Sequence, residues 1–225
     1  MGIDNQCSLW DQYARAYHMV LPEWKPYSTL AESISRHFKG LGSVIDIACG
    51  PGIMSNHISE NCVKVIGVDS SQGMLEYARK NIKGNCEFRY GDFNNLAFPN
   101  EEFDGALLCN ALYVAPDPYK VLVNSTNTLR RDGVFVVSGP VPNPDIEYLI
   151  ENLYFEMRDK GLAESLKVEI DIVARLNREI KKSHIRNGYY SSQMLDLLSG
   201  IGLRTVLEAR DDFYFGNCFM VACRK

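Results

Sequence analysis

The chain has 225 residues, of which 46% are hydrophobic, 11% aromatic and 23% charged. These values are typical of a globular protein with a full hydrophobic core, and they exclude a disordered, collagenous or fibrous chain. The formal net charge of −4 gives no general attraction to a phosphate backbone, so we expect no nucleic-acid partner.

The sequence also bears on location and metal content. The longest strongly apolar stretch, residues 105–116, is too short to span a bilayer, and no apolar leader run precedes it, so we expect a cytoplasmic protein without a membrane partner. The seven cysteines contain no CxxC pair, which favours reduced thiols over disulfides and predicts no metal site.

From residue 44 onward, short β-rich runs alternate with helical patterns, which indicates parallel βαβ units. The expected strands are 44–48, 63–69, 86–90, 103–109 and 134–139. Helices are expected to begin near residues 53, 72 and 119, and the third of them to end at a turn over 131–133.

The second half of the chain departs from this alternation. A proline-rich linker at 140–145 leads to a helical hairpin within 144–188, inserted before a helix over 191–200 that Ser191 or Ser192 caps. Two strands over 203–210 and 213–224 follow, with only Asp211 and Asp212 at their turn, so the sheet should end antiparallel.

The predicted fold is therefore α/β: a Rossmann-like, seven-stranded, mostly parallel sheet with a terminal antiparallel strand. We interpret residues 1–225 as a single domain. Its parts are an N-terminal helical lid (1–43), a cofactor-binding core (44–138), a helical insert or substrate cap (144–188) and the end of the sheet (189–225).

In an open α/β sheet, ligands bind beyond the carboxyl ends of the strands. The glycines of ACGPG allow a sharp turn after the first strand, and Asp69 ends the second strand about 20 residues later, a spacing typical of an acid that binds a nucleoside ribose. The alternative is that Asp69 only caps the next helix.

Polar side chains also follow the third and fourth strands. Asp92 could accept a hydrogen bond from an exocyclic amine with Phe93 beside it, although a turn aspartate next to a core phenylalanine is equally compatible. Asn110 interrupts an apolar run, and a buried asparagine needs partners.

With these strand ends, the sequence resembles the class I S-adenosylmethionine-dependent methyltransferases, in particular their small-molecule group. The resemblance is carried by VIDIACGPG, VIGVDSSQGML, YGDF, FDGALLCNALYVAPDP and LRRDGVFVVSG. It covers residues 44–138 closely, and the last helix and strand pair loosely.

The resemblance implies S-adenosylmethionine as cofactor. In the family, the first turn surrounds the methionine portion, the acid after the second strand binds both ribose hydroxyls, and the third strand end meets the adenine. The N-terminal stretch WDQYARAYH resembles the family's lid helix, although it could simply be packing. The matching positions here are Tyr17, Asp46, Ala48, Gly50, Gly52, Asp69, Ser70, Met74, Asp92, Phe93 and Asn110.

The acceptor side is less well defined by the resemblance. Many relatives carry histidine after the fourth strand where this chain has Tyr113 and Val114, so no family base carries over. The catalytic candidates are His18, Tyr113 and His184, although either histidine could be an ordinary surface residue. Candidate lining residues for a partly apolar acceptor are Tyr13, His18, Tyr113, Tyr189 and Tyr190, of which the last two could instead dock the insert on the core.

The resemblance implies methyl transfer to an O, N, C or S atom of a small-molecule acceptor by in-line displacement, driven mainly by positioning and exclusion of water. Two alternatives stay open: a nicotinamide-dependent oxidoreductase, because a glycine turn followed by an acid fits both classes, and a non-catalytic S-adenosylmethionine-binding subunit. We expect a monomer or a homodimer.

Overall fold

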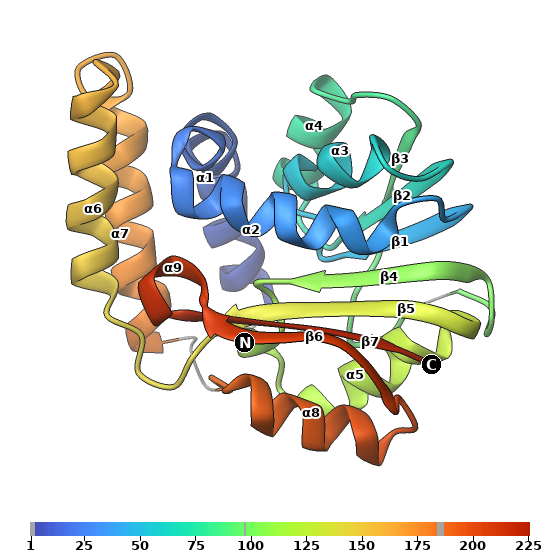
Figure 1. Ribbon diagram of the computed structural model, residues 1–225. Coiled ribbons are helices and arrows are strands. Elements are labelled where there is room, and N and C mark those ends of the chain that lie inside the picture. The colour runs from blue at the N-terminus through green and yellow to red at the C-terminus, as the bar shows by residue number, and fades with distance from the viewer. Residues whose placement is uncertain (1–2, 97, 184–186) are drawn as a thin grey trace.

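The computed structural model describes residues 3–96, 98–183 and 187–225, and its centre is one seven-stranded sheet (Figure 1). The strand order is β3-β2-β1-β4-β5-β7-β6. The strands are β1 (Ser43–Ile47), β2 (Lys64–Asp69), β3 (Cys86–Tyr90), β4 (Phe103–Cys109), β5 (Leu129–Pro140), β6 (Thr205–Asp212) and β7 (Cys218–Arg224). The pairings from β3 to β5 are parallel, and β7 is antiparallel to both neighbours, which confirms the predicted fold class.

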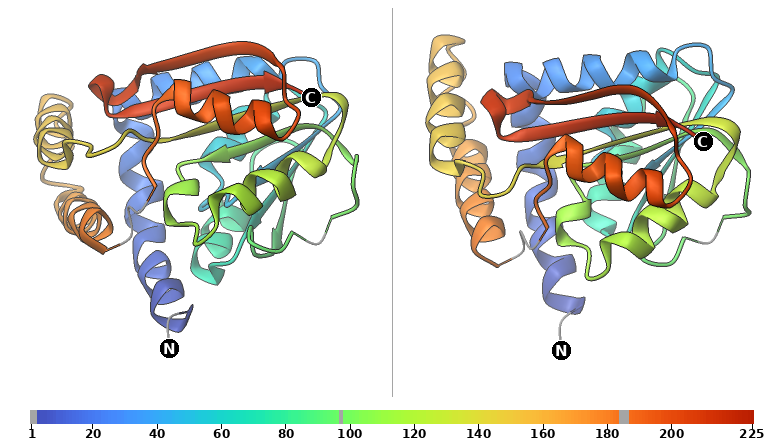
Figure 2. Two further views of the ribbon diagram at one scale, coloured as in Figure 1. Left: turned by 90° about the horizontal axis from the view of Figure 1, so that it is seen from below. Right: turned by 60° about the horizontal axis from the view of Figure 1, so that its bottom comes forward.

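Helices cover both faces of the sheet because alternate strand residues point to opposite sides. Val44, for example, belongs to one hydrophobic cluster and Ile45 to the other. The first face carries α1 (Ile3–Val20), α2 (Lys25–Ser35), α3 (Ile53–Ser59) and α4 (Gln72–Lys80), with short 3-10 turns at η1 (Leu21–Glu23) and η2 (Arg36–Phe38). The other face carries η3 (Leu112–Val114), α5 (Pro118–Asn127) and α8 (Ser191–Gly200), as Figure 2 shows.

A helical hairpin, α6 (Ile146–Asp159) and α7 (Lys167–Ser183), stands beyond the sheet rather than on either face. In Figure 1 the arrowheads of β4 and β5 point toward α1 and this hairpin, so the carboxyl ends of the strands face the space between them. Asp145 begins α6 by accepting a hydrogen bond from the Tyr148 N–H at 3.1 Å.

Several hydrogen bonds attach the hairpin to the N-terminal helices. The Trp24 indole N–H donates to Asn152 Oδ1 at 2.8 Å, and the Lys25 N–H donates to Glu156 Oε2 at 2.9 Å. The Asn177 amide donates to the Tyr13 hydroxyl oxygen at 2.9 Å. The hairpin and the N-terminal helices thus lie on either side of the space beyond the strand ends, and these hydrogen bonds join them.

Several predicted boundaries were wrong. Helix α5 ends at Asn127 rather than at 131–133, because β5 already begins at Leu129, with a register shift before Gly105 pairs with Val134. Strand β6 continues through Asp212, so Asp211 and Asp212 do not form the turn. The chain instead reverses over α9 (Phe213–Gly216), a short left-handed turn. Within the described ranges, no helix has the length and apolarity needed to cross a membrane.

Substitution of Gly67, in the middle of β2, tests how tightly side chains pack against the sheet. A Cβ at this position would lie 2.6 Å from the Phe88 ring and 2.9 Å from Cys49 Sγ, so Gly67→Ala should lower the free energy of unfolding by about 1–3 kcal/mol. Gly200→Ala is the control, because its Cβ meets nothing within 4 Å and alanine suits a helix. Urea unfolding of both variants measures the difference, and equal midpoints would contradict tight packing at β2.

Candidate functional site

The turn after β1 exposes backbone atoms to a cavity. Ala48, Gly50 and Gly52 have φ values of 57°, 54° and 79°, in the left-handed region that glycine adopts most easily. The two glycines serve different purposes: a Cβ on Gly50 would find Met74 Sδ nearest, at 3.8 Å, whereas a Cβ on Gly52 would lie 2.6 Å from the Phe88 ring. Gly50 therefore faces the cavity, and Gly52 is required for packing.

Asp69 at the end of β2 connects this turn to the next loop. Its two carboxylate oxygens accept hydrogen bonds from the Gly50 N–H and the Ser71 N–H, each at 2.8 Å. Ser71, not Asp69, caps α4, because the Ser71 hydroxyl accepts the Met74 N–H at 3.0 Å. Burial raises the pKa of Asp69, and the backbone N–H groups of Ser71 and Gly50 oppose that rise.

Asp46 in β1 is the other acidic group at this edge of the sheet. Its side chain is almost fully buried and accepts a hydrogen bond from the Ser55 hydroxyl at 2.6 Å. Burial is the main cause that raises the pKa of Asp46 to about 7, and the nearby Asp69 adds to the rise.

These strand ends surround a cavity, which we call the cofactor cavity. Most of the predicted cofactor residues line it: Tyr17, Asp46, Ala48, Gly50, Asp69, Ser70, Met74, Phe93 and Asn110. Gly52 and Asp92 are not among its described lining residues. Asp92 is exposed, and its Oδ1 accepts hydrogen bonds from the Asn94 N–H and side-chain amide, both at 2.8 Å, so its carboxylate is engaged in its own turn.

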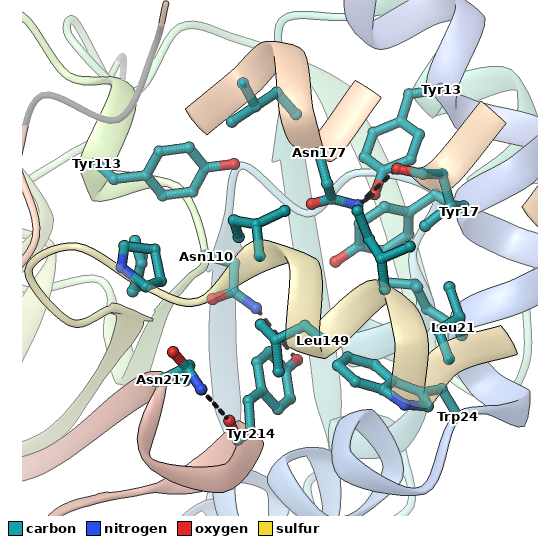
Figure 3. A pocket seen from close by; sticks show the side chains of 18 of the residues that line it. Tyr13, Tyr17, Leu21, Trp24, Asn110, Tyr113, Leu149, Asn177, Tyr214 and Asn217 are labelled. Atoms are coloured by element: carbon teal, nitrogen blue, oxygen red, sulfur yellow. Dashed lines mark hydrogen bonds between the residues drawn. The ribbon is translucent and has the colours of Figure 1, made fainter. Parts of the chain in front are cut away.

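A second cavity, the acceptor cavity, adjoins the first, since Trp10, Tyr17 and Asn110 line both. Its walls come from α1, η1, the start of α2, the turn after β4, the hairpin and α9 (Figure 3). Its lining is mainly apolar and aromatic. The described lining residues are Trp10, Tyr13, Tyr17, Leu21, Trp24, Asn110, Tyr113, Pro140, Pro144, Ile146, Leu149, Ile150, Leu153, Val173, Asn177, Ile180, Tyr214, Asn217 and Cys218.

Two of the predicted acceptor-side residues, Tyr13 and Tyr113, lie in this cavity, and burial raises the pKa of both. Tyr17 and Tyr214 have raised pKa values for the same reason. At neutral pH these phenols therefore keep their protons, so their hydroxyl groups can donate or accept hydrogen bonds but are not phenolate bases.

The other predicted acceptor-side residues are not brought to the cavity. His18 lines a separate surface depression with Asn81 and Lys83, and burial lowers its pKa. Tyr189 belongs to the hydrophobic cluster on the opposite face, with its ring centroid 6.5 Å from that of Phe219. Tyr190 is exposed and precedes α8, whereas His184 lies outside the described residues.

Sequence reasoning missed several lining residues, notably Trp10, Trp24, Asn177 and Tyr214. Both tryptophans lie within the predicted lid, where a tryptophan could have been noticed as a large aromatic contact. Asn177 and Tyr214 gave no such indication, because only the packing of distant segments brings them to the cavity.

In the described part of the chain, no group of three His, Cys, Asp or Glu is placed to hold a metal ion.

Tyr214 reaches the cavity through an unusual backbone. Tyr214 and Phe215 have φ values of 50° and 57°, and such left-handed conformations cost about 1–3 kcal/mol each in residues other than glycine. The Tyr214 ring packs on Trp24 with ring centroids 5.0 Å apart, and the Tyr214 hydroxyl lies 3.5 Å from the Asn110 amide nitrogen.

Comparison with known proteins agrees with this geometry. Residues 45–137 match a family model described as a methyltransferase domain. The chain is 32% identical over 137 residues to a demethylmenaquinone methyltransferase from Lactococcus lactis, covering 56% of this chain and 54% of the relative. It is 27% identical over 110 residues to a ubiquinone biosynthesis O-methyltransferase from Dinoroseobacter shibae, covering 48% and 44%. The chain thus spans about half the length of these curated relatives.

The fold likeness extends further along the chain. A magnesium protoporphyrin IX methyltransferase from Synechocystis PCC 6803, solved with SAH bound, superposes with a TM-score of 0.64 at 14% identity, over 96% of this chain and 93% of that protein. Residues 45–137 thus match a methyltransferase domain, and the strand order gives the chain the fold of this solved methyltransferase.

Proposed function

We propose that the protein transfers a methyl group from S-adenosylmethionine to a small, mostly apolar acceptor. The observation that carries this proposal is the meeting of two cavities at Tyr17 and Asn110. One cavity is lined mainly by strand ends of the family-matched domain, and the other mainly by aromatic and aliphatic side chains from outside it. Two adjoining sites of this kind suit a reaction between two bound molecules.

The residues of the cofactor cavity fit the proposed cofactor. Asp69 has two partly buried carboxylate oxygens, which accept the Gly50 and Ser71 N–H groups and have further lone pairs for ligand hydroxyls. The Gly50 backbone is open to the cavity, and Met74 and Phe93 offer apolar contacts for a base. Asp46 supplies a carboxyl group where a positively charged portion of the cofactor would favour its ionised form.

When bound, S-adenosylmethionine supplies a methyl group on a positively charged sulfur, which is an activated leaving group. The chain's own contribution is then to bind, orient and exclude water. Positioning two reactants removes translational and rotational freedom from the step and can supply about 7–11 kcal/mol. Tyr17 and Trp10, which line both cavities, place aromatic faces where a cationic sulfur is attracted to them.

The acceptor class follows from the lining of the acceptor cavity. Apart from tyrosine, tryptophan and cysteine, its described polar lining consists of the three asparagines Asn110, Asn177 and Asn217, so it suits an uncharged ring compound that carries a few polar atoms. Relatives named for demethylmenaquinone and for ubiquinone biosynthesis support a small-molecule acceptor. Tyr113 stays a candidate for contact with the acceptor.

We also propose a cytoplasmic location and a monomeric or homodimeric state, and both proposals rest on composition.

Two measurements test the proposed function. Titration calorimetry should detect binding of S-adenosylmethionine and S-adenosylhomocysteine but not of NAD, and binding of NAD alone would favour an oxidoreductase. Turnover is then measured as S-adenosylhomocysteine release with phenol, catechol, aniline, benzylamine and thiophenol as acceptor probes. Cofactor binding without turnover on any probe would favour a non-catalytic binding subunit.

The Asp69 carboxylate should be required for cofactor binding. Asp69→Ala removes charge-assisted hydrogen bonds, so we expect binding of S-adenosylhomocysteine to weaken by about 1.5–3 kcal/mol in calorimetry. Asp196→Ala removes the same charge from an exposed position on α8 and should leave the dissociation constant unchanged. If both variants bind as the wild type does, Asp69 is not a cofactor ligand.

The raised pKa of Asp46 predicts a pH-dependent stability of the unliganded protein. Between the ordinary aspartate pKa and about 7, the unfolded chain has released this proton while the folded protein retains it, so stability falls as pH rises. We expect this group to lower the free energy of unfolding by about 2 kcal/mol between pH 5.5 and 7.5. Urea unfolding of Asp46→Asn, which cannot titrate, should show a loss smaller by that amount. Equal losses would contradict the assignment.

The acceptor cavity can be filled without touching the cofactor cavity. Leu149 on α6 lines only the former, so Leu149→Trp should raise the acceptor KM roughly 10-fold or more while the cofactor dissociation constant stays within about 2-fold. Glu151→Trp, an exposed position on the same helix, is the control. An unchanged KM in Leu149→Trp would exclude this cavity as the acceptor site.

A further inference from the structure

The left-handed turn α9 carries two neighbouring aromatic residues whose side chains point in different directions. Tyr214 points into the acceptor cavity (Figure 3). Phe215 is half exposed, is not among the described lining residues, and has its ring centroid 5.4 Å from that of Tyr148. Strained backbone of this kind persists only where the surrounding structure over-determines it. Its effect here is to aim the Tyr214 side chain inward.

Asn217 is the residue that holds this turn. Its side-chain amide donates to the Tyr214 carbonyl oxygen at 3.0 Å and to the Phe215 carbonyl oxygen at 3.4 Å. Its Oδ1 accepts the Asp145 N–H at 2.6 Å, and its backbone carbonyl accepts the Val141 N–H at 3.1 Å. One side chain thus ties the strained turn to the linker from which the hairpin begins.

The Tyr214 hydroxyl lies where the two cavities meet. It is 3.5 Å from the amide nitrogen of Asn110, which lines both of them. This distance is at the outer limit of a hydrogen bond, so the pair is spaced loosely enough for a third polar atom to approach both groups. On its other side the Tyr214 ring packs against Trp24, which limits its movement.

We propose that Tyr214 and Asn110 bind the polar atom of the acceptor at the mouth of the cofactor cavity, and that Asn217 is a positioning residue that holds Tyr214 there. The acceptor would carry an oxygen or nitrogen atom on an apolar ring or chain. The ring would lie among the apolar side chains of the hairpin, such as Leu149 and Ile150. This inference rests on the proposed function and adds the residue that selects and orients the acceptor.

The test uses three variants of the full chain with the acceptor probe of highest turnover. Tyr214→Phe keeps the ring and removes the hydroxyl, so the acceptor KM should rise about 3- to 10-fold. Asn217→Asp keeps the oxygen that accepts the Asp145 N–H but loses the amide that clamps the turn, so it should also raise KM. Phe215→Gly is the control, because it alters the same turn at the exposed neighbour and should leave KM within 2-fold. In all three, calorimetry should give an unchanged dissociation constant for S-adenosylhomocysteine.

A double-mutant cycle separates positioning from general disturbance of the fold. If Asn217 acts through the Tyr214 hydroxyl, Asn217→Asp should change KM much less in the Tyr214→Phe background than in the wild type. Inhibition by toluene, which fills a cavity but has no polar atom, should be the same within 2-fold in the wild type and in Tyr214→Phe.

The outcomes distinguish this inference from the proposed function. A wild-type protein that binds the cofactor but turns over no acceptor overturns both. If the wild type is active and Tyr214→Phe leaves KM unchanged, or if the two substitutions raise KM additively, the role of the turn is refuted while the methyl-transfer proposal stands. A Phe215→Gly variant that raises KM as much as Asn217→Asp would also refute it.

Discussion

The carboxylate of Asp69 is the contact on which the cofactor edge of the sheet depends. It accepts the N–H groups of Gly50 and Ser71, one from the turn after β1 and one from the loop after β2. These loops are adjacent only because β1 and β2 are parallel neighbours, and buried backbone donors without an acceptor are unfavourable. A single partly buried side chain therefore fixes the path of two loops and turns the open Gly50 backbone toward the cavity.

The two cavities have different origins in the chain. The cofactor cavity is lined mainly by residues of the family-matched domain, whose loops follow directly from short buried strands. The acceptor cavity is lined mainly by α1, the region around η1, the hairpin and α9, which lie outside that match. The fold thus separates the cofactor cavity, whose lining depends on a strained glycine turn, from the acceptor cavity, whose shape depends on the packing of apolar side chains.

The sequence was informative where the chemistry is local. Strand periodicity and the residues at the strand ends predicted the sheet and most of the cofactor lining, because each depends on a few consecutive residues. The directions of adjacent side chains on a helix were harder to predict. Tyr17 and His18 are neighbours in sequence, but successive residues on a helix point about 100° apart. Tyr17 therefore lines both cavities, whereas His18 lines a separate depression. Tyr214 could not be predicted, because its position depends on a left-handed turn whose sequence lacks glycine at either strained residue.

The attachment of the hairpin to the N-terminal helices has a consequence for exchanging parts between relatives. Trp24 donates to Asn152, Asn177 donates to Tyr13, and Lys25 donates to Glu156, so each segment supplies polar partners that the other needs. A chimera that takes only the hairpin from a relative would leave these donors and acceptors without their partners. Residues 1–43 and 144–188 are therefore best transplanted as a matched pair, onto a sheet that can stay as it is.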